Sequence, residues 1–129
     1  MSRKYKITNQ QGIYFVTFTI VGWVDIFIRN EYKYIFIDSI KYCQIHKGLE
    51  VYAWCIMTSH VHLIIGKNGA NKIEDIIRDL KSFTSRNIKN AILNNYQESR
   101  RQWMMWIFTK AGENNSRNNE FQFWIHNGS

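Results

Sequence analysis

The sequence has few cysteines and no long apolar run. Cys43 and Cys55 are isolated, and each lies in an apolar pattern, so we predict small core residues in a reducing compartment rather than a disulfide or a metal knuckle. No apolar stretch approaches the ~20 residues that a membrane-spanning helix needs. The segment Met1–Lys6 is polar and basic, unlike the start of a signal peptide. We therefore expect a cytoplasmic protein with no membrane partner.

Acidic residues are also scarce. Asp and Glu number 10 against 17 Lys and Arg, which gives a formal net charge of +7. Such an excess favours a polyanionic partner, above all nucleic acid. The chain has 129 residues, 45% of them hydrophobic, and no internal repeat, which suits one domain with an adequate core. We predict a single domain over residues 1–129.

The apolar pattern alternates between the period of strands and the period of helices. Gly48 is expected to end the first helix, and Asn71 with Glu74 predicts a capping box at the start of the second. This order predicts an α+β fold, a ferredoxin-like or RRM-like antiparallel sheet with helices on one face and the other face open. The expected elements are a strand at 13–21, a helix at 31–47, strands at 50–57 and 60–65, helices at 71–93 and 97–111, and a strand at 121–125.

Two histidines, His60 and His62, interrupt the apolar strand at 60–65. Residues two apart in a strand point to the same face, so the two imidazoles are expected side by side. Val61, Leu63 and Ile65 then face the core. Neutral imidazole binds Zn and Mn and contributes to a Mg site completed by oxygens. Two hydrogen-bonded or half-exposed histidines without a metal would have the same spacing, so the spacing alone leaves both interpretations open.

The residues around these histidines resemble the HUH signature of single-tyrosine transposases, which include insertion-sequence and REP-associated transposases. A short polar residue, Ser59, stands where members often carry Asn. The resemblance covers most of the chain. It rests on the opening strand at 12–18, the strand end Tyr52–Trp54, Met57 before a short turn, the His-Val-His pattern, the long helix after it, and the segment Phe121–Trp124.

The resemblance implies DNA transposition by metal-dependent cleavage and rejoining of single-stranded DNA through a phosphotyrosine intermediate. His60 and His62 would then be the catalytic metal ligands for Mg or Mn. In this family the nucleophilic tyrosine and a third metal ligand come from a further helix, usually just ahead of an Asn-Pro-Val stretch, and this sequence contains no proline. We therefore expect a C-terminally shortened domain whose nucleophile is unassigned.

Basic residues predict where DNA binds. On a helical wheel Arg78, Lys81 and Lys89 fall opposite the apolar stripe of the long helix, and Arg3 and Lys4 lie near the N-terminus. We predict that these five side chains contact phosphates of single-stranded or hairpin DNA. The alternative for each is an ordinary solvated face.

Two other functions remain open. The chain could be a non-catalytic remnant that binds hairpin DNA, for example as a regulator, or an RRM-like RNA-binding module whose histidines are structural. The sequence lacks the K/R-G-F-G-F pattern expected of an RRM-like module, which counts against this function. Only the transposase and the remnant predict a metal at the two histidines, and a homodimer is left open as well. Four aromatic residues are assigned first to the core or to a partner interface, although they could stack unpaired bases: Trp103, Trp106, Phe123 and Trp124.

Overall fold

The computed structural model describes residues 7–114 and 120–126. These residues form an α+β fold, as predicted, and none of their helices is long and apolar enough to cross a membrane. The elements, in order, are β1 (Tyr14–Thr19), the 3-10 turns η1 (Val21–Trp23) and η2 (Ile26–Ile28), α1 (Asn30–His46), β2 (Leu49–Ile56), β3 (His60–Lys67), α2 (Ile73–Asn94) and α3 (Arg101–Glu113).

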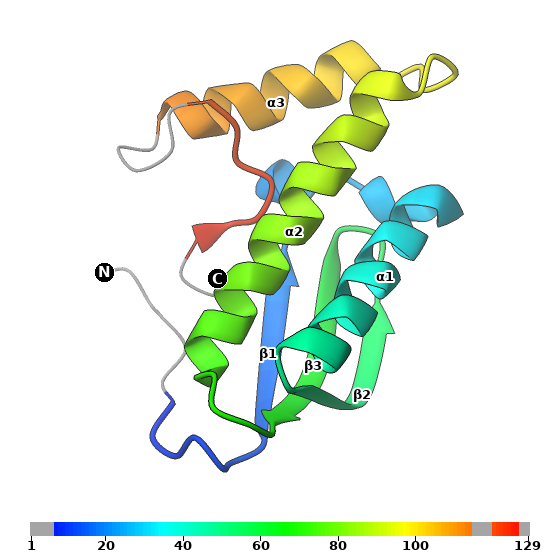
Figure 1. Cartoon of the computed structure of the whole chain (residues 1–129). Helices are drawn as coiled ribbons and strands as arrows, with labels where there is room; N and C mark the ends of the chain where they lie inside the picture. Colours follow the sequence, from blue (N-terminus) through cyan, green and yellow to red (C-terminus); the bar gives the residue numbers. More distant parts are fainter. Residues whose placement is uncertain (1–6, 115–119, 127–129) are drawn as a thin grey trace.

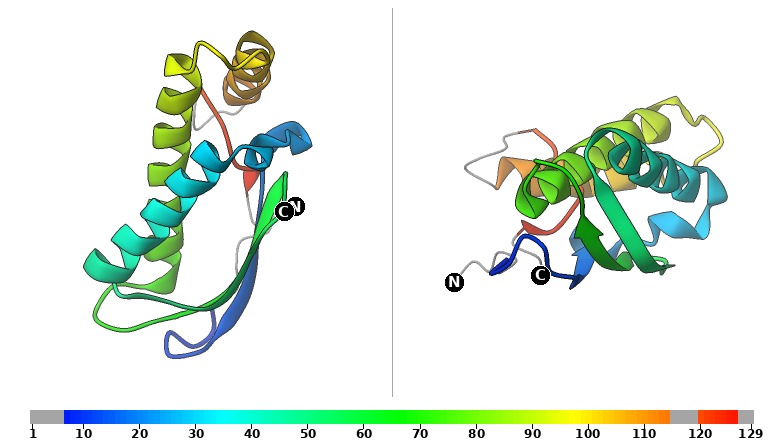
Figure 2. Two further views of the ribbon diagram at one scale, coloured as in Figure 1. Left: turned by 90° about the vertical axis from the view of Figure 1, so that its right-hand side faces the viewer. Right: turned by 60° about the horizontal axis from the view of Figure 1, so that its bottom comes forward.

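The sheet is antiparallel with the order β1-β3-β2, so β3 is its central strand. Helices α1 and α2 both lie on one face of the sheet, and α3 lies beyond the C-terminal end of α2 (Figures 1 and 2). Val61, Leu63 and Ile65 are buried beneath the helices. No helix among the described residues covers the other face. The predicted sheet with helices on one side is therefore confirmed.

Helix α2 has the expected buried stripe as far as Ile88, but Ile92 is buried where Ala91 was predicted, and the helix has a different start. The predicted capping box is wrong, because Asn71 donates instead to the Lys47 carbonyl (3.2 Å). Gln10 takes over: its Oε1 accepts from the Ile73 N–H (2.8 Å) and its Nε2 donates to Glu74 (2.7 Å). A cap that comes from a remote segment leaves no local signal in the sequence. The buried residues are Ile73, Ile76, Ile77, Leu80, Thr84, Ile88 and Ile92.

The strand expected at 121–125 is reduced to a single β-bridge between Ile20 and Trp124 among the described residues. Flanking backbone bonds run from Val21 N–H to the Phe123 carbonyl and from Ile125 N–H to the Thr19 carbonyl. The buried Trp124 indole also donates to the Thr84 hydroxyl (2.8 Å). Two backbone hydrogen bonds and the Trp124 side chain therefore hold this segment beside β1 and α2, where a strand was predicted.

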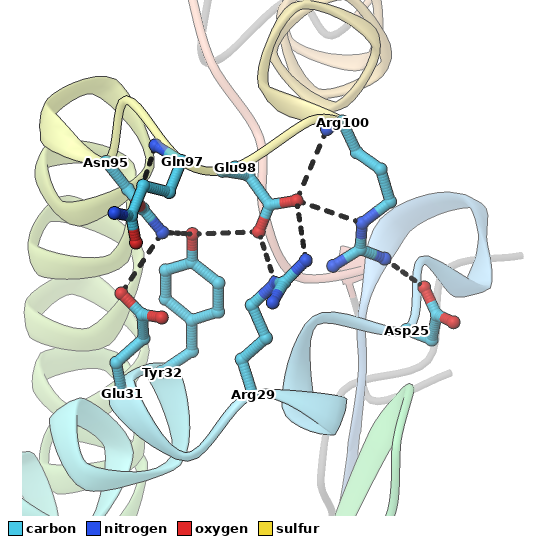
Figure 3. Close-up of polar contacts among 8 residues, drawn as sticks. All are labelled: Asp25, Arg29, Glu31, Tyr32, Asn95, Gln97, Glu98 and Arg100. Atoms are coloured by element: carbon cyan, nitrogen blue, oxygen red, sulfur yellow. Dashed lines mark hydrogen bonds and ion pairs between the residues drawn. The ribbon is translucent and has the colours of Figure 1, made fainter.

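A buried carboxylate fixes the loop between α2 and α3 (Figure 3). The Glu98 side chain is fully buried and accepts bonds from Arg29 Nε (2.7 Å), Arg100 Nε (3.1 Å) and the Tyr32 hydroxyl (3.2 Å). Arg100 also pairs with Asp25. Burial alone would raise the pKa of Glu98, but the hydrogen bonds from Arg100 and Arg29 outweigh it and lower that pKa. The network joins the α3 end of the molecule to the start of α1.

Candidate functional site

The two histidines are positioned by the tight turn between β2 and β3. Thr58 and Ser59 are not the residues that two-residue hairpin turns favour, which are Asn-Gly, Asp-Gly and Gly-X. Their carbonyls accept bonds from outside the hairpin, Thr58 from the Phe27 N–H (3.0 Å) and Ser59 from the Ile20 N–H (2.9 Å). The hairpin itself is closed by Met57 N–H donating to the His60 carbonyl (2.8 Å). Tertiary contacts thus fix the point at which β3 begins.

His60 and His62 lie side by side on the sheet face opposite the helices, as predicted. Their ring centroids are 4.9 Å apart and the rings are inclined at 75°. His62 Nδ1 lies 2.9 Å from the Thr17 hydroxyl, and His60 Nδ1 lies 3.3 Å from the Ser59 hydroxyl. A metal-binding histidine normally uses its second ring nitrogen in such a bond, which fixes the tautomer. The pair therefore fits a site in which both Nε2 atoms serve as ligands.

The candidate metal ligands are the two imidazoles of His60 and His62. Within residues 7–114 and 120–126, no group of three or more His, Cys, Asp or Glu side chains comes together in a way that could hold a metal. Two nitrogen ligands leave the remaining coordination positions to oxygens such as water or a phosphate. The geometry thus supports an open His₂ site rather than a closed structural one.

Aromatic rings flank the histidines. Phe15 stacks on His62 with centroids 5.4 Å apart and an interplanar angle of 18°, and Trp23 contacts His60 edge to face at 5.7 Å. Neither residue was singled out from the sequence. Strand alternation could have identified Phe15, which shares the face of Thr17. Trp23 has no such signal, because its placement depends on a left-handed backbone at φ 55°.

The two cysteines behave differently from each other. Cys43 is buried, as predicted, and burial raises the pKa of its thiol to about 11. Cys55 was expected in the core, but it is exposed on the open sheet face, where it pairs in register with His62. A bulge between Val51 and Ala53 shifts the pairing of β2 with β3, and Cys55 lies after this shift.

Basic side chains line a groove between α2 and the segment 120–126, which we call the basic groove. Its cations are Arg78, Lys81, Arg86 and Lys89. Arg78 is paired with Asp75 and Asp79, whereas Lys89 lies 5.1 Å above the Phe121 ring. Three of the five predicted DNA contacts thus share one groove. The other two, Arg3 and Lys4, lie outside the described residues.

Lys81 departs from its expected position opposite the apolar stripe. It is half-buried, and its ammonium lies 4.9 Å from the centroid of the Phe18 ring. Burial lowers the pKa of Lys81 to about 8. The wheel prediction is wrong because Lys81 lies on the flank of α2 that faces Phe18 of β1. The basic groove is on the helix side of the sheet, so the structure keeps it apart from His60 and His62.

Phe123 and Trp124 are in the core, whereas Trp103 and Trp106 are exposed on α3. The core interpretation is therefore confirmed for the first two, and a partner interface is the remaining interpretation for the other two. Among the described residues, no tyrosine ring contacts His60 or His62; the ring contacts of the pair are with Phe15, Trp23 and each other. The described tyrosines are Tyr14, Tyr32, Tyr34, Tyr42, Tyr52 and Tyr96.

Two solved structures resemble the chain. One is a REP-associated tyrosine transposase bound to a REP hairpin, with a TM-score of 0.58 and 18% identity over 68% of this chain and 53% of that one. The other is a protein from Deinococcus radiodurans R1 described as a transposase, with a TM-score of 0.51 and 20% identity over 70% of this chain and 68% of that one. The chain thus spans about half the length of the REP-associated protein. At these identities the likeness establishes the fold.

The sequence itself carries the family assignment. No curated protein matches it significantly. The sequence profile described as "Transposase IS200 like" matches residues 24–117, which is most of the chain and includes both histidines. The chain therefore belongs to the IS200-like transposase family.

Proposed function

We propose that this chain is the DNA-handling domain of a transposase that cuts and rejoins single-stranded DNA beside a hairpin. The observation that carries the proposal is the pair His60 and His62, half-buried side by side on the open sheet face, with the Nδ1 of His62 2.9 Å from the Thr17 hydroxyl. Family membership supports the class of reaction.

His60 and His62 would hold Mg or Mn through their Nε2 atoms. The bound ion would polarise a scissile phosphate and stabilise negative charge on its oxygens. In that state Nδ1 of His62 would carry the proton and donate to the Thr17 hydroxyl, 2.9 Å away, which leaves Nε2 as the ligand. The Ser59 hydroxyl, 3.3 Å from Nδ1 of His60, would have the same role there.

The covalent step would use a tyrosine. Its phenolate oxygen attacks the phosphorus, the 3′ oxygen of the preceding nucleotide leaves, and a 5′-phosphotyrosine bond forms. The reverse attack by a 3′ hydroxyl rejoins a strand, so the bond energy is conserved and no nucleotide cofactor is consumed. No tyrosine among the described residues contacts the histidines, and the nucleophile remains unassigned.

The basic groove is the proposed contact for the backbone of the hairpin. Arg78, Lys81 and Lys89 are joined there by Arg86, and Ser82 and Ser85 add hydroxyl donors. Lysine and arginine release counterions when they neutralise phosphates, which favours binding. Strand β1 separates this groove from the histidines, so a hairpin stem in the groove would send its single strand around the β1 edge.

A second candidate is a hairpin-binding regulator that does not cut DNA. The absence of a tyrosine beside the histidines in the described part of the chain favours it. Incubation with Mn and a labelled hairpin separates the two, because only the transposase yields a covalent protein–DNA adduct on a denaturing gel. Family membership speaks against the RNA-binding module.

Calorimetric titration with Mn tests the site. We expect wild-type protein to bind Mn and the double variant His60→Ala, His62→Ala to lose that binding, because the neighbouring Thr17 hydroxyl cannot replace two imidazole ligands. His46→Ala removes an exposed histidine on α1 that contacts Tyr42, and it should bind Mn like the wild type. Unchanged Mn affinity in the double variant would show that the histidines are structural.

A further inference from the structure

Four rings form a row on the open face of the sheet. Phe15 stacks on His62 at 5.4 Å, His62 contacts His60 at 4.9 Å, and Trp23 contacts His60 at 5.7 Å. The two imidazoles are in the middle, and a carbocyclic or indole ring stands at each end. The row crosses from β1 to β3 and ends at the turn η1.

The two outer rings are held in solvent. Phe15 is 64% exposed and Trp23 is 65% exposed, although rings of this size normally contribute most by being buried. Trp23 also has φ 55°, directly after Gly22 at φ 67°. A positive φ is strained for a bulky residue, and strain of this kind persists mainly at binding and catalytic sites. The fold thus keeps an indole outside the core at a conformational cost.

Unpaired DNA bases fit this row. A single strand offers a base on each side of every phosphate, and a base stacks well on an aromatic ring whatever its identity. The histidines in the middle suit the phosphate, and the net charge of +7 suits the strand. We propose that Phe15 and Trp23 stack the bases that flank the phosphate held at His60 and His62. This inference rests on the proposed function and adds the two residues that position the strand.

A binding experiment with two DNA ligands tests it. One ligand is a hairpin alone, and the other is the same hairpin with a single-stranded extension, placed at the 5′ end or the 3′ end in separate titrations. We expect the wild type to bind the extended hairpin more tightly. Phe15→Leu and Trp23→Leu should each weaken binding of the extended hairpin by about 5-fold to 100-fold, the usual effect of losing one stacked base, and leave binding of the hairpin alone unchanged.

Further variants separate stacking from folding. Trp23→Gly suits the left-handed backbone and should remain folded while losing the extension-dependent affinity. Trp23→Phe keeps a ring and should retain most of it. Trp106→Leu removes another exposed indole, on α3, and is the matched control that should behave as wild type.

Cysteine alkylation gives a second readout on unaltered protein. Cys55 is exposed and pairs in register with His62, whereas Cys43 is buried and serves as an internal control. The extended hairpin should protect Cys55 from alkylation, and the hairpin alone should not.

The outcomes distinguish failure of the stacking inference from failure of the proposed function. If the wild type binds both ligands equally and the Phe15 and Trp23 variants bind like it, or if Cys55 is alkylated equally in both complexes, stacking is wrong while hairpin binding stands. If the wild type binds neither ligand, the proposed function fails and the stacking inference falls with it.

Discussion

At the scale of single residues, the tertiary environment changes what a side chain does. Lys81 and Lys89 occupy the same helix and line the same groove, yet Lys81 is directed over Phe18 and Lys89 over Phe121. Burial lowers the pKa of Lys81 to about 8. The sequence predicts only that Lys81 contacts a phosphate. Its lowered pKa means that it also loses its charge in mildly alkaline solution.

The pH dependence of stability tests the state of Lys81. In the unfolded chain its pKa returns to about 10.5, so above pH 8 the unfolded state binds a proton that the folded state has lost. The free energy of unfolding of the wild type should therefore rise between pH 7 and pH 9.5, relative to Lys81→Met, by up to about 2 kcal/mol. Urea titrations at a series of pH values measure this difference.

Lys110→Met is the control for Lys81. This lysine is exposed near the end of α3, and the variant should follow the wild-type pH curve. Parallel curves for wild type and Lys81→Met would mean that the Lys81 ammonium is solvated in the folded protein.

At the scale of elements, one buried carboxylate connects α3 to the rest of the fold. Glu98 receives bonds from Arg29, Tyr32 and Arg100, which come from the start of α1 and from the loop before α3. Neutralising it would leave Arg29 without this carboxylate and Arg100 with Asp25 alone, beside a fully buried side chain. The position of α3, and of Trp103 and Trp106 on it, depends on this contact.

Glu98→Gln should lower the free energy of unfolding at pH 7 by about 3 kcal/mol, the low end for a broken buried ion pair because both arginines are partly exposed. The lowered pKa of Glu98 also sets the direction in which stability changes with pH. Its contribution is complete above pH ~4.5 and is lost as the pH falls through the folded value, so the wild type should lose stability in acid more steeply than the variant. Denaturant unfolding at pH 7 and below pH 4.5 checks both.

Glu113→Gln is the matched control for Glu98, because Glu113 is exposed and, among the residues that the structure describes, its ion pair is with Lys110 at 3.7 Å. It should change stability by less than about 0.5 kcal/mol. Equal effects of the two substitutions would contradict the role given to the buried network.

At the scale of the whole molecule, the sheet separates two surfaces. The basic groove lies along α2 on the helix side, and the histidines are on the sheet face opposite the buried Val61, Leu63 and Ile65. Under the proposed function, a plain duplex would occupy only the groove, whereas a hairpin with an unpaired strand would reach both surfaces. The affinity gained from an unpaired strand should therefore report on the open face, and the salt dependence of binding on the basic groove.

We predict that the protein prefers an extended hairpin to a random duplex, and that its affinity falls steeply with salt because bound cations release counterions. The double variant Arg86→Ala, Lys89→Ala should reduce the slope of log affinity against log salt by about 1.5, since each phosphate contact contributes about 0.7 to 0.9. Fluorescence anisotropy over a range of salt concentrations measures it. Lys110→Ala should leave the slope unchanged, and equal affinity for duplex and hairpin would contradict the preference.

Much of this protein follows from local sequence. The alternation in β3 is enough to put His60 and His62 on one face and Val61 and Leu63 on the other, because strand periodicity is fixed by backbone geometry. The same holds for the buried stripe of α2 and for the end of α1 at Gly48, whose φ of 83° suits glycine.

What only the tertiary structure decided involves partners distant in the sequence. Gln10 caps α2, backbone groups of Ile20 and Phe27 hold the turn before His60, and Trp124 bridges to Ile20 without forming a strand. The exposure of Trp23 beside His60 belongs to the same class. Each depends on which segments meet in space, and neither propensity nor periodicity carries that information.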